Sequence, residues 1–321
     1  MGGMRATGLA GKRLEFAALG VILALALAVP FIGLYPVFVM TLLCFALFAC
    51  AFNLLLGYAG LLSFGHAAYF GAAAYATGWL AKTRGFTPEA ALLGGVVVAA
   101  LLGGLVGAIA IRRSGIYFAM ITLALAQLAY FVFLQAPFTG GEDGLQGVPR
   151  GHLLGLVSLQ SDRAMYYLVL AVFVLAYLFI RRTIHSPFGQ VLKAIRENEP
   201  RAVSLGYDVA LYKLVAFVIS TALAGLAGGL KTLVLGFASL SDAHWSLSGE
   251  VILMTLLGGL GTLFGPVLGA GIVIGLQNLL ADKVGPWVTV IMGVIFVVCV
   301  LAFRQGIIGA LRRLVGRPAR S

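Results

Sequence analysis

Residues 186–213, SPFGQVLKAIRENEPRAVSLGYDVALYK, form a polar stretch between two long apolar runs. The chain as a whole is 61% hydrophobic and 10% charged, whereas a soluble domain carries roughly 25% charged residues. Apolar runs of about 20 residues, the length that crosses a bilayer, recur on both sides of the polar stretch. The sequence therefore predicts an all-α, polytopic membrane protein with one structured polar loop.

About ten transmembrane helices are predicted from the apolar runs. Their ranges are 14–34, 36–56, 62–81, 89–111, 115–135, 164–181, 213–235, 249–261, 263–281 and 286–303. They form a single transmembrane domain, 14–303, between an N-terminal segment 1–13 and a basic tail 304–321. The run that ends near Ala28 resembles a signal peptide, but it continues to Leu34, which favours a first membrane anchor.

Basic residues are divided unevenly between the two sides of this topology. With the N-terminus inside, sixteen lysines and arginines lie on the cytoplasmic side and five lie outside. The five are Lys82, Arg84, Arg150, Arg163 and Lys283. Positive charge concentrates on the cytoplasmic side of membrane proteins, so both termini are predicted to be cytoplasmic. This asymmetry explains the net charge of +11 without a nucleic-acid partner. In the same topology, the polar stretch lies in a cytoplasmic loop, 182–213, and residues 136–163 form an external loop.

Glycine interrupts one apolar segment in each half of the chain. The first is GYAGLLSFGHAAYFG, 57–71, and the second is GGLGTLFGPVLG, 258–269, which fits either two short crossings or a re-entrant hairpin. Tight helix packing explains such glycines, but breaks in both halves of a transporter also point to the permeation path. We therefore expect residues of both breaks to line that path. They are Gly60, Ser63, Phe64, Gly65 and His66, followed by Gly258, Gly259, Gly261, Thr262, Phe264 and Gly265.

Residues that could carry chemistry inside the membrane are few. The four histidines are far apart, and neither a metal-ligand spacing, a Walker loop nor a catalytic motif occurs. Lys231 and Glu250 lie near span ends. We expect their side chains to extend to water there, and a role in transport is the alternative. Ion-coupled carriers usually need intramembrane carboxylates, and Glu250 is the one acid near a span interior. The sequence predicts a transport subunit without enzymatic activity, metal or bound cofactor, whose energy is delivered from outside the membrane.

Two short helices are predicted inside the cytoplasmic loop. Ser186 caps a helix over 187–197 that has proline in its first position. Pro200 prevents this helix from continuing, and Asn198 caps a second one at about 199–205. Two such helices make a rigid knob against which a soluble partner can push, whereas a merely solvated loop is the alternative.

The end of this loop resembles the coupling loop by which ABC importer permeases dock their ATPases. The usual pattern there is Glu-Ala-Ala, three residues and then Gly. Here Ala202 and Gly206 keep the spacing, whereas the glutamate lies one residue early, at Glu199, and Pro200 takes its place. The resemblance implies a docking surface for the ATPase. Its residues are Arg196, Glu197, Asn198, Glu199, Pro200, Ala202 and Gly206.

A longer resemblance extends from about Asn53 to Gly309. The blocks NLLLGYAGLLSFGHAAYFGAAAYA, YFAMITLALAQ, TGGEDGL, SPFGQVLKAIRENEPRAVSLGYD and LLGGLGTLFGPVLGA are similar, in order, to those of the LivM-type permease family of branched-chain amino acid ABC importers. The resemblance implies a LivH-like second permease, two cytoplasmic ATPase subunits that bind ATP and Mg, a periplasmic binding protein and a place in the bacterial inner membrane. The external loop and the segment 237–248, with Asp242 and Trp245, would face the binding protein.

These expectations combine into one function, the ATP-driven import of branched-chain, hydrophobic amino acids. The same machinery could carry urea, amides or other amino acids, because the binding protein does much of the selecting. An ion-coupled secondary transporter and a passive channel are alternatives of a different class. The scarcity of buried acids counts against the first, and the absence of an Asn-Pro-Ala half-helix signature counts against the second.

Overall fold

A computed structural model of the chain describes residues 35–153, 155, 157–287, 290, 291, 293–295 and 297. The predicted span 14–34, most of the span 286–303 and the terminal segments 1–13 and 304–321 lie outside these residues. Each of the other eight predicted spans overlaps a helix of the structure. The mostly helical, polytopic architecture is therefore confirmed, and the number of membrane crossings stays a prediction.

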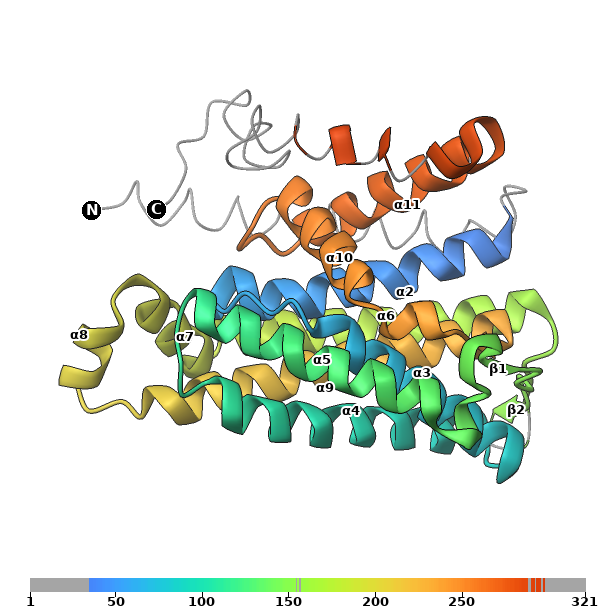
Figure 1. Cartoon of the computed structure of the whole chain (residues 1–321), viewed down its shortest axis with the longest axis horizontal. Helices are drawn as coiled ribbons and strands as arrows, with labels where there is room; N and C mark the ends of the chain where they lie inside the picture. Colours follow the sequence, from blue (N-terminus) through green and yellow to red (C-terminus); the bar gives the residue numbers. More distant parts are fainter. Residues whose placement is uncertain are drawn as a thin grey trace, which may run out of the picture.

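Six long helices form the body of the molecule and run along its long axis (Figure 1). They are α2 (Pro36–Asn53), α3 (His66–Thr83), α4 (Pro88–Ala110), α5 (Ile116–Gln135), α6 (Asp162–His185) and α9 (Val209–Leu235). Within the described residues, five helices are long and apolar enough to cross a membrane: α2 with its π-helical continuation, α4, α5, α6 and α9. α3 is rich in alanine and glycine, and it packs against α4 and α9 with most of its residues buried.

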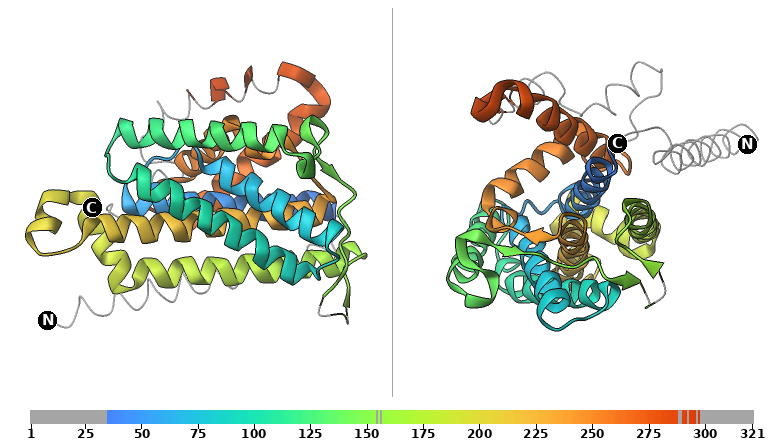
Figure 2. Two further views of the ribbon diagram at one scale, coloured as in Figure 1. Left: turned by 60° about the horizontal axis from the view of Figure 1, so that its bottom comes forward. Right: turned by 90° about the vertical axis from the view of Figure 1, so that its right-hand side faces the viewer.

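A shorter pair, α10 (Trp245–Gly258) and α11 (Gly265–Val284), packs beside α2 and covers one side of the bundle (Figures 1 and 2). The two predicted pieces of the segment 249–281 are therefore two helices that pack against each other. α10 has only 14 residues. At 1.5 Å per residue, a helix of this length spans about two thirds of a typical hydrocarbon core.

The two ends of the bundle differ in structure. One end carries α7 (Pro187–Glu197) and α8 (Glu199–Ser204), and we call residues 187–206 the knob (Figure 1). The opposite end, which we call the strand end, carries short strands and 3₁₀ turns. These are η3 (Pro137–Thr139), η4 (Gly141–Asp143), β1 (Leu145–Gln146), β2 (His152–Leu153), β3 (Val157–Ser158), β4 (Phe237–Ala238), η5 (Leu240–Ala243) and η6 (Gly285–Trp287).

The strands are an addition to the predicted all-α fold. β1 pairs with β4 in antiparallel register, Leu145 opposite Ala238, so the loop after α5 is joined to the turn after α9. β2 and β3 form a second antiparallel pair. Each strand has two residues, which is too short to leave an alternating apolar pattern in the sequence.

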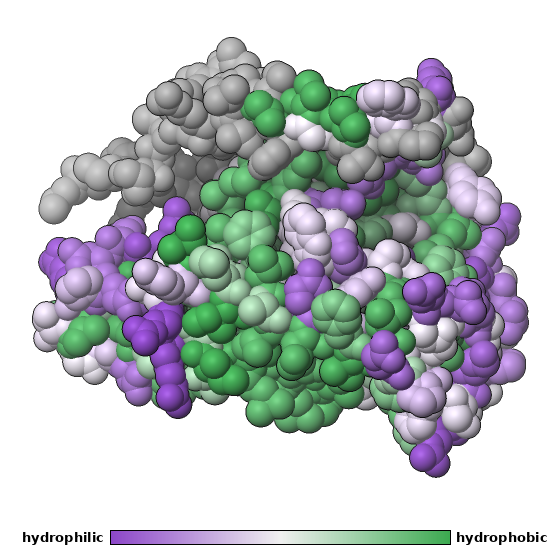
Figure 3. All heavy atoms as spheres, in the orientation of Figure 1, coloured by the Kyte–Doolittle hydropathy of each residue, from purple (hydrophilic) through white to green (hydrophobic). Residues whose placement is uncertain are grey.

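On the face shown in Figure 3, apolar residues predominate across the middle of the molecule and polar residues gather at both ends. Large apolar side chains are exposed on α4, α5 and α6. They include Leu93, Leu101, Leu105, Ile116, Met120, Leu128, Phe131 and Leu175. A contiguous exposed apolar surface of this kind is typical of a protein that contacts lipid or membrane-embedded partners.

Candidate transport and coupling site

The first glycine break begins in a π-helical turn, Leu54–Ala59, that continues α2. Gly60 follows in the left-handed region with a φ of 72°, which residues with a side chain rarely adopt. Residues 61–65 contain no helix, and α3 begins at His66. The break predicted at 57–71 is therefore present, and π-helical turns occur frequently at functional sites.

The second glycine break separates α10 from α11. Gly259 and Gly261 have φ angles of 113° and 70°, and α11 begins at Gly265, directly after Phe264. Thr262 closes the turn, because its Oγ1 donates to Gly259 O at 2.8 Å and accepts from Gly265 N at 3.1 Å. Both breaks thus pass from a left-handed glycine to a Phe-Gly pair at the start of the next helix.

Asn53, at the end of α2, connects the two breaks. Its buried side chain donates from Nδ2 to Thr262 O at 2.8 Å and accepts at Oδ1 from Gly261 N at 3.0 Å. One planar amide therefore satisfies both a donor and an acceptor of a distant backbone segment. Asn53 is absent from the predicted path residues. Its signal in the sequence is a polar side chain at membrane depth, which is costly unless it finds a hydrogen-bond partner.

The backbones of the two breaks touch beside Asn53. A Cβ added to Gly57 would lie 2.7 Å from Gly261 N and would overlap the Asn53 side chain. A Cβ added to Gly261 would lie 3.3 Å from Gly57 O, and its φ already excludes most other residues. Only glycine at Gly57 allows this approach without a shift of the backbone.

α7 reaches the same point through Arg196. The Nη1 group of Arg196 donates a hydrogen bond to Gly57 O. A Cβ on Gly60 would lie 3.0 Å from Arg196 Cγ, so the aliphatic part of the arginine rests on this glycine. Lys193, almost one turn earlier, places its Nζ 5.6 Å from the centre of the Tyr58 ring. The predicted coupling loop and the predicted path therefore contact each other directly.

His66 and Ser63 lie inside the bundle. His66 is fully buried, and its Nε2 lies 3.0 Å from Ser220 Oγ on α9. The ring contacts four aromatic side chains, Phe48, Phe52, Tyr69 and Phe217. Ser63 is fully buried, and Phe64 is partly buried against the core. In this conformation these residues join the start of α3 to its neighbours, and their contact with a transported molecule stays a prediction.

The start of each helix that follows a break is held closely. A Cβ on Gly65 would lie 2.9 Å from Ala126 Cβ of α5, so α3 begins directly against that helix. On the other side, Phe264 packs against Tyr177 of α6, with 5.6 Å between the ring centroids. Gly258 lies against the backbone of Gly265, since a Cβ there would overlap the Gly265 carbonyl. The starts of α3 and α11 are therefore packed against other helices, whereas Gly60 and Leu260 within the breaks are exposed.

The two helices of the knob begin and end where the sequence predicts. Ser186 Oγ accepts from Gly189 N at 3.4 Å, and Asn198 Oδ1 accepts from Arg201 N at 3.1 Å, so both predicted caps are confirmed. Gly206 follows α8 with a φ of 84°, the left-handed conformation typical of a glycine that ends a helix.

The predicted docking residues fall into two groups. Arg196, Glu197, Asn198, Pro200 and Gly206 are exposed. Ala202 is buried in a small apolar cluster with Ile195 and Val209, which holds α8 against α7 and α9. Glu199 forms an ion pair with the buried Lys213 Nζ at 2.7 Å, so its carboxylate secures α8 to α9.

Sequence reasoning missed an exposed apolar group on the knob. Val203, Leu205 and Tyr207 expose 58%, 69% and 40% of their surface. They follow the first turn of α8, beyond the end of the long helices (Figure 1). Apolar side chains on an otherwise polar surface often mark a contact with another protein. From the sequence alone, these exposed apolar residues cannot be distinguished from apolar residues of a short helix that face the protein core.

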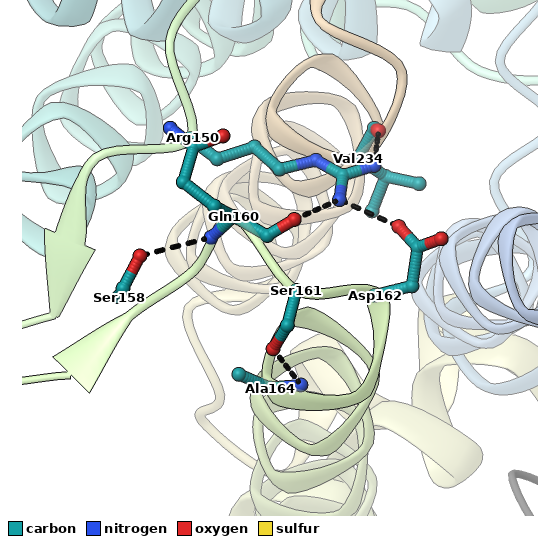
Figure 4. A network of polar contacts seen from close by, with 7 residues as sticks. All are labelled: Arg150, Ser158, Gln160, Ser161, Asp162, Ala164 and Val234. Atoms are coloured by element: carbon teal, nitrogen blue, oxygen red, sulfur yellow. Dashed lines mark hydrogen bonds and ion pairs between the residues drawn. The ribbon is translucent and has the colours of Figure 1, made fainter.

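The strand end is tied together by Arg150 (Figure 4). Its guanidinium contacts Asp162 Oδ1 at 2.6 Å and Gln160 O at 3.5 Å through Nη1, and it donates to Val234 O at 3.0 Å through Nη2. The loop after α5 is thereby joined to the start of α6 and the end of α9.

Lys231 and Asp242 form a buried ion pair near the strand end. Asp242 Oδ2 also accepts from Ser239 N at 3.2 Å. The expectations that Lys231 reaches water and that Asp242 faces a partner are both wrong. η5 folds back over the bundle and brings Asp242 to Lys231, and mutual pairing lets both charges be buried. Glu250, which is partly buried, accepts from Gln277 Nε2 at 3.3 Å.

Across the part of the chain that the structure describes, no group of three His, Cys, Asp or Glu side chains could hold a metal ion. The contacts of Asn53 and Arg196 are hydrogen bonds to backbone groups of the two breaks. The arrangement is suited to transmitting movement between segments.

Comparisons with known proteins give consistent results. Residues 35–300 match the family described as branched-chain amino acid transport system / permease component. The high-affinity branched-chain amino acid transport system permease protein LivM of Salmonella typhimurium is 29% identical over 288 residues, which cover 81% of this chain and 67% of that protein. The Escherichia coli protein of the same name is 29% identical over 287 residues, with the same coverage. A probable LivM of Methanocaldococcus jannaschii is 32% identical over 130 residues, which cover 39% of this chain and 37% of that protein. No solved structure matches the chain.

Proposed function

Because the chain belongs to the family of permease components of branched-chain amino acid transport systems, we propose that it is the permease subunit of an ATP-driven ABC importer. It moves branched-chain, hydrophobic amino acids across the bacterial inner membrane. Separate cytoplasmic ATPase subunits hydrolyse the ATP, and this chain is a transport subunit without catalytic activity.

One observation carries the proposal beyond family membership, namely the contact between the knob and both glycine breaks. Arg196 lies on α7 and donates to Gly57 O, whose segment touches Gly261 in the second break. A secondary transporter or a simple pore has no need for such a connection to a protruding loop. A permease driven by a soluble ATPase needs one.

The exposed apolar group of the knob, Val203, Leu205 and Tyr207, supplies the surface for the ATPase together with Glu197. Closure of the ATPase dimer on ATP moves the knob, and the helices pass from an outward-open to an inward-open arrangement. ATP drives this change because the ATPase binds it with different affinity in the two states.

The remaining partners follow from the same proposal. A LivH-like second permease completes the membrane part, and a periplasmic binding protein delivers substrate to the strand end. Glu142 and Asp143 are exposed there, in the loop after α5, and are available to basic residues of the binding protein. In the segment 237–248, Asp242 is buried, but Trp245 exposes 47% of its surface and is available for contact with the binding protein.

An apolar substrate suits the breaks. In the first break, Ser63 and His66 are fully buried, and His66 is hydrogen-bonded within the protein. The path residues are otherwise glycines and phenylalanines, apart from Thr262, whose hydroxyl is engaged within its own turn. Leu, Ile and Val are therefore the substrates proposed, with urea, amides and other amino acids as the alternatives for the same machinery.

The test is uptake of radiolabelled leucine into proteoliposomes that hold this chain with its permease and ATPase partners. ATP and the binding protein are each added or left out. Uptake that needs both is the expected result. ATP hydrolysis stimulated by the binding protein without leucine uptake would refute the substrate, and the alternatives would then be assayed. Uptake by this chain alone, driven by an ion gradient, would refute the ABC mechanism.

A further inference from the structure

We propose that Arg196 and Asn53 are positioning residues that link the knob, the first break and the second break in series, so that movement of α7 shifts both breaks together. The inference deepens the proposed function and rests on it for the source of movement. It assigns a role to Asn53, and it assigns Arg196, an exposed residue of α7, to the contact between the knob and the bundle.

The first link joins α7 to the π-helical turn. Arg196 donates a charge-assisted hydrogen bond to Gly57 O, a type of bond about twice as strong as one between neutral groups. Leu192, on the same helix, is fully buried in an apolar cluster that also contains Leu55 and Ala59 of the turn. The helix and the turn are thus held by one directional contact and one packing contact, so they move as a unit.

The second link joins the first break to the second. Asn53 immediately precedes the π-helical turn, and its amide binds the backbone at Gly261 and Thr262 through two hydrogen bonds. Two bonds from one planar group fix both the distance and the orientation of the segments. Asn53 is 3% exposed, and Gly261 and Thr262 are partly buried, so loss of either bond would remove the side-chain partner of a partly buried backbone group.

The series arrangement follows from which residue touches which segment. Arg196 Nη1 lies near Gly261, where an added Cβ would be 3.5 Å away, but its hydrogen bond is to Gly57 O. Asn53, which immediately precedes the same turn, makes the hydrogen bonds to the second break. Coupling between distant sites is carried by hydrogen bonds and packed contacts between rigid elements. α7, α2 and α10 are such elements, and the contacts at Gly57 and Asn53 are the joints between them.

If the contacts act in series, each substitution should abolish the response to ATP only in the segments beyond it, and this can be measured. Hydrogen–deuterium exchange of 57–62 and 258–263 is measured in the complete importer in proteoliposomes, with and without ATP. In the wild type, ATP changes exchange in both segments. In Arg196→Gln neither segment responds. In Asn53→Ala the first segment responds and the second does not.

Transport gives a second readout. Substrate imported per ATP hydrolysed falls at least about tenfold in Asn53→Ala, which loses both hydrogen bonds of a buried side chain. It falls several-fold in Arg196→Gln, whose hydrogen bond to Gly57 O is partly buried. The controls Arg113→Gln and Asn278→Ala delete the same groups from exposed positions after α4 and on α11. They stay within about twofold of the wild type, as is usual for surface substitutions. If Asn53→Ala does not accumulate, Asn53→Asp replaces it, since aspartate keeps the acceptor for Gly261 N, replaces the donor to Thr262 O by a second acceptor and adds a negative charge.

The inference and the proposed function fail in different ways. If the second segment of Asn53→Ala still responds to ATP, or if import per ATP is unchanged in both variants, the series link is refuted. If ATP hydrolysis and import fall in parallel, Arg196 acts in docking and the positioning role is refuted. If ATP changes neither segment of the wild-type complex although uptake needs ATP, the link between the knob and the breaks is refuted and the proposed function stands. If uptake does not need ATP, the proposed ABC mechanism itself is wrong.

Discussion

Lys231 and Asp242 bury opposite charges between α9 and η5, close to the strand end. Burial of an ion pair costs desolvation energy that the pairing only roughly offsets, so the pair adds little net stability. Removal of one partner is different, because the remaining charge is then buried alone. The pair therefore makes the position of η5 relative to α9 sensitive to single substitutions.

Asp242→Asn is expected to lower the stability of the bundle by about 3–5 kcal/mol, the cost of an uncompensated buried charge. The measurement is thermal unfolding of the purified protein in detergent, followed by loss of the monodisperse chromatographic peak. The additional substitution Lys231→Met removes the unpaired charge, and Asn at position 242 keeps an acceptor for Ser239 N. The double variant should therefore recover most of the lost stability. A single variant as stable as the wild type would contradict the buried pair.

Charge reversal separates the roles of Glu197 and Glu199. Glu199→Lys places two positive charges together at Lys213, and we expect loss of coupling between ATP hydrolysis and transport because α8 leaves its position on α9. The second reversal, Lys213→Glu, should restore coupling. Glu197→Lys should uncouple ATP hydrolysis from transport without lowering membrane abundance, and Lys213→Glu should not rescue it. Equal rescue of both variants would remove Glu197 from the docking surface.

At the scale of elements, the sequence predicts those features that depend on neighbouring residues, such as the ends of helices. The two knob helices begin and end as predicted because Ser186, Asn198 and Gly206 act on their immediate neighbours. Both helix breaks are visible as glycines. The contact between Asn53 and Gly261 spans 208 positions and leaves no local pattern. The buried Lys231–Asp242 pair is hidden for a related reason, since it depends on how the η5 turn folds back.

The hairpin of α10 and α11 depends on the contact between Gly258 and Gly265. Gly258→Ala would place a methyl group on the Gly265 carbonyl, and overpacking of this kind costs about 1–3 kcal/mol. We expect membrane abundance of the chain to fall several-fold for this reason. Gly271→Ala is the matched control, since it makes the same change within a helix and meets no atom within 4 Å. Similar abundance of both variants would contradict this packing.

At the scale of the whole molecule, the face shown in Figure 3 is largely apolar across its middle and polar at its two ends, which differ in structure. Basic residues near the knob end outnumber those near the strand end. The first group is Arg112, Arg113, Arg181, Arg182, Lys193, Arg196, Arg201 and Lys213, and the second is Lys82, Arg84, Arg150, Arg163 and Lys283. The positive-inside rule therefore predicts that the knob lies in the cytoplasm, where ATP is available.

Sided labelling tests this orientation. Ser204→Cys lies on α8 and Ser158→Cys on β3, and both positions are exposed. In a background that lacks Cys44, Cys50 and Cys299, a membrane-impermeant maleimide added outside intact cells should label only position 158. Position 204 should be labelled after the membrane is opened. The reverse pattern would invert the topology.

The central claim is that the knob is where the ATPase subunits act on this chain. A photo-crosslinking residue placed at Leu205, on the exposed apolar group of the knob, tests it in the assembled complex. The matched control is Val157 on β3, which is also apolar and 50% exposed. A covalent adduct with the ATPase subunit from Leu205, and none from Val157, is the predicted result. An assembled, ATP-hydrolysing complex that gives no such adduct from Leu205, or gives it from Val157, would contradict the account.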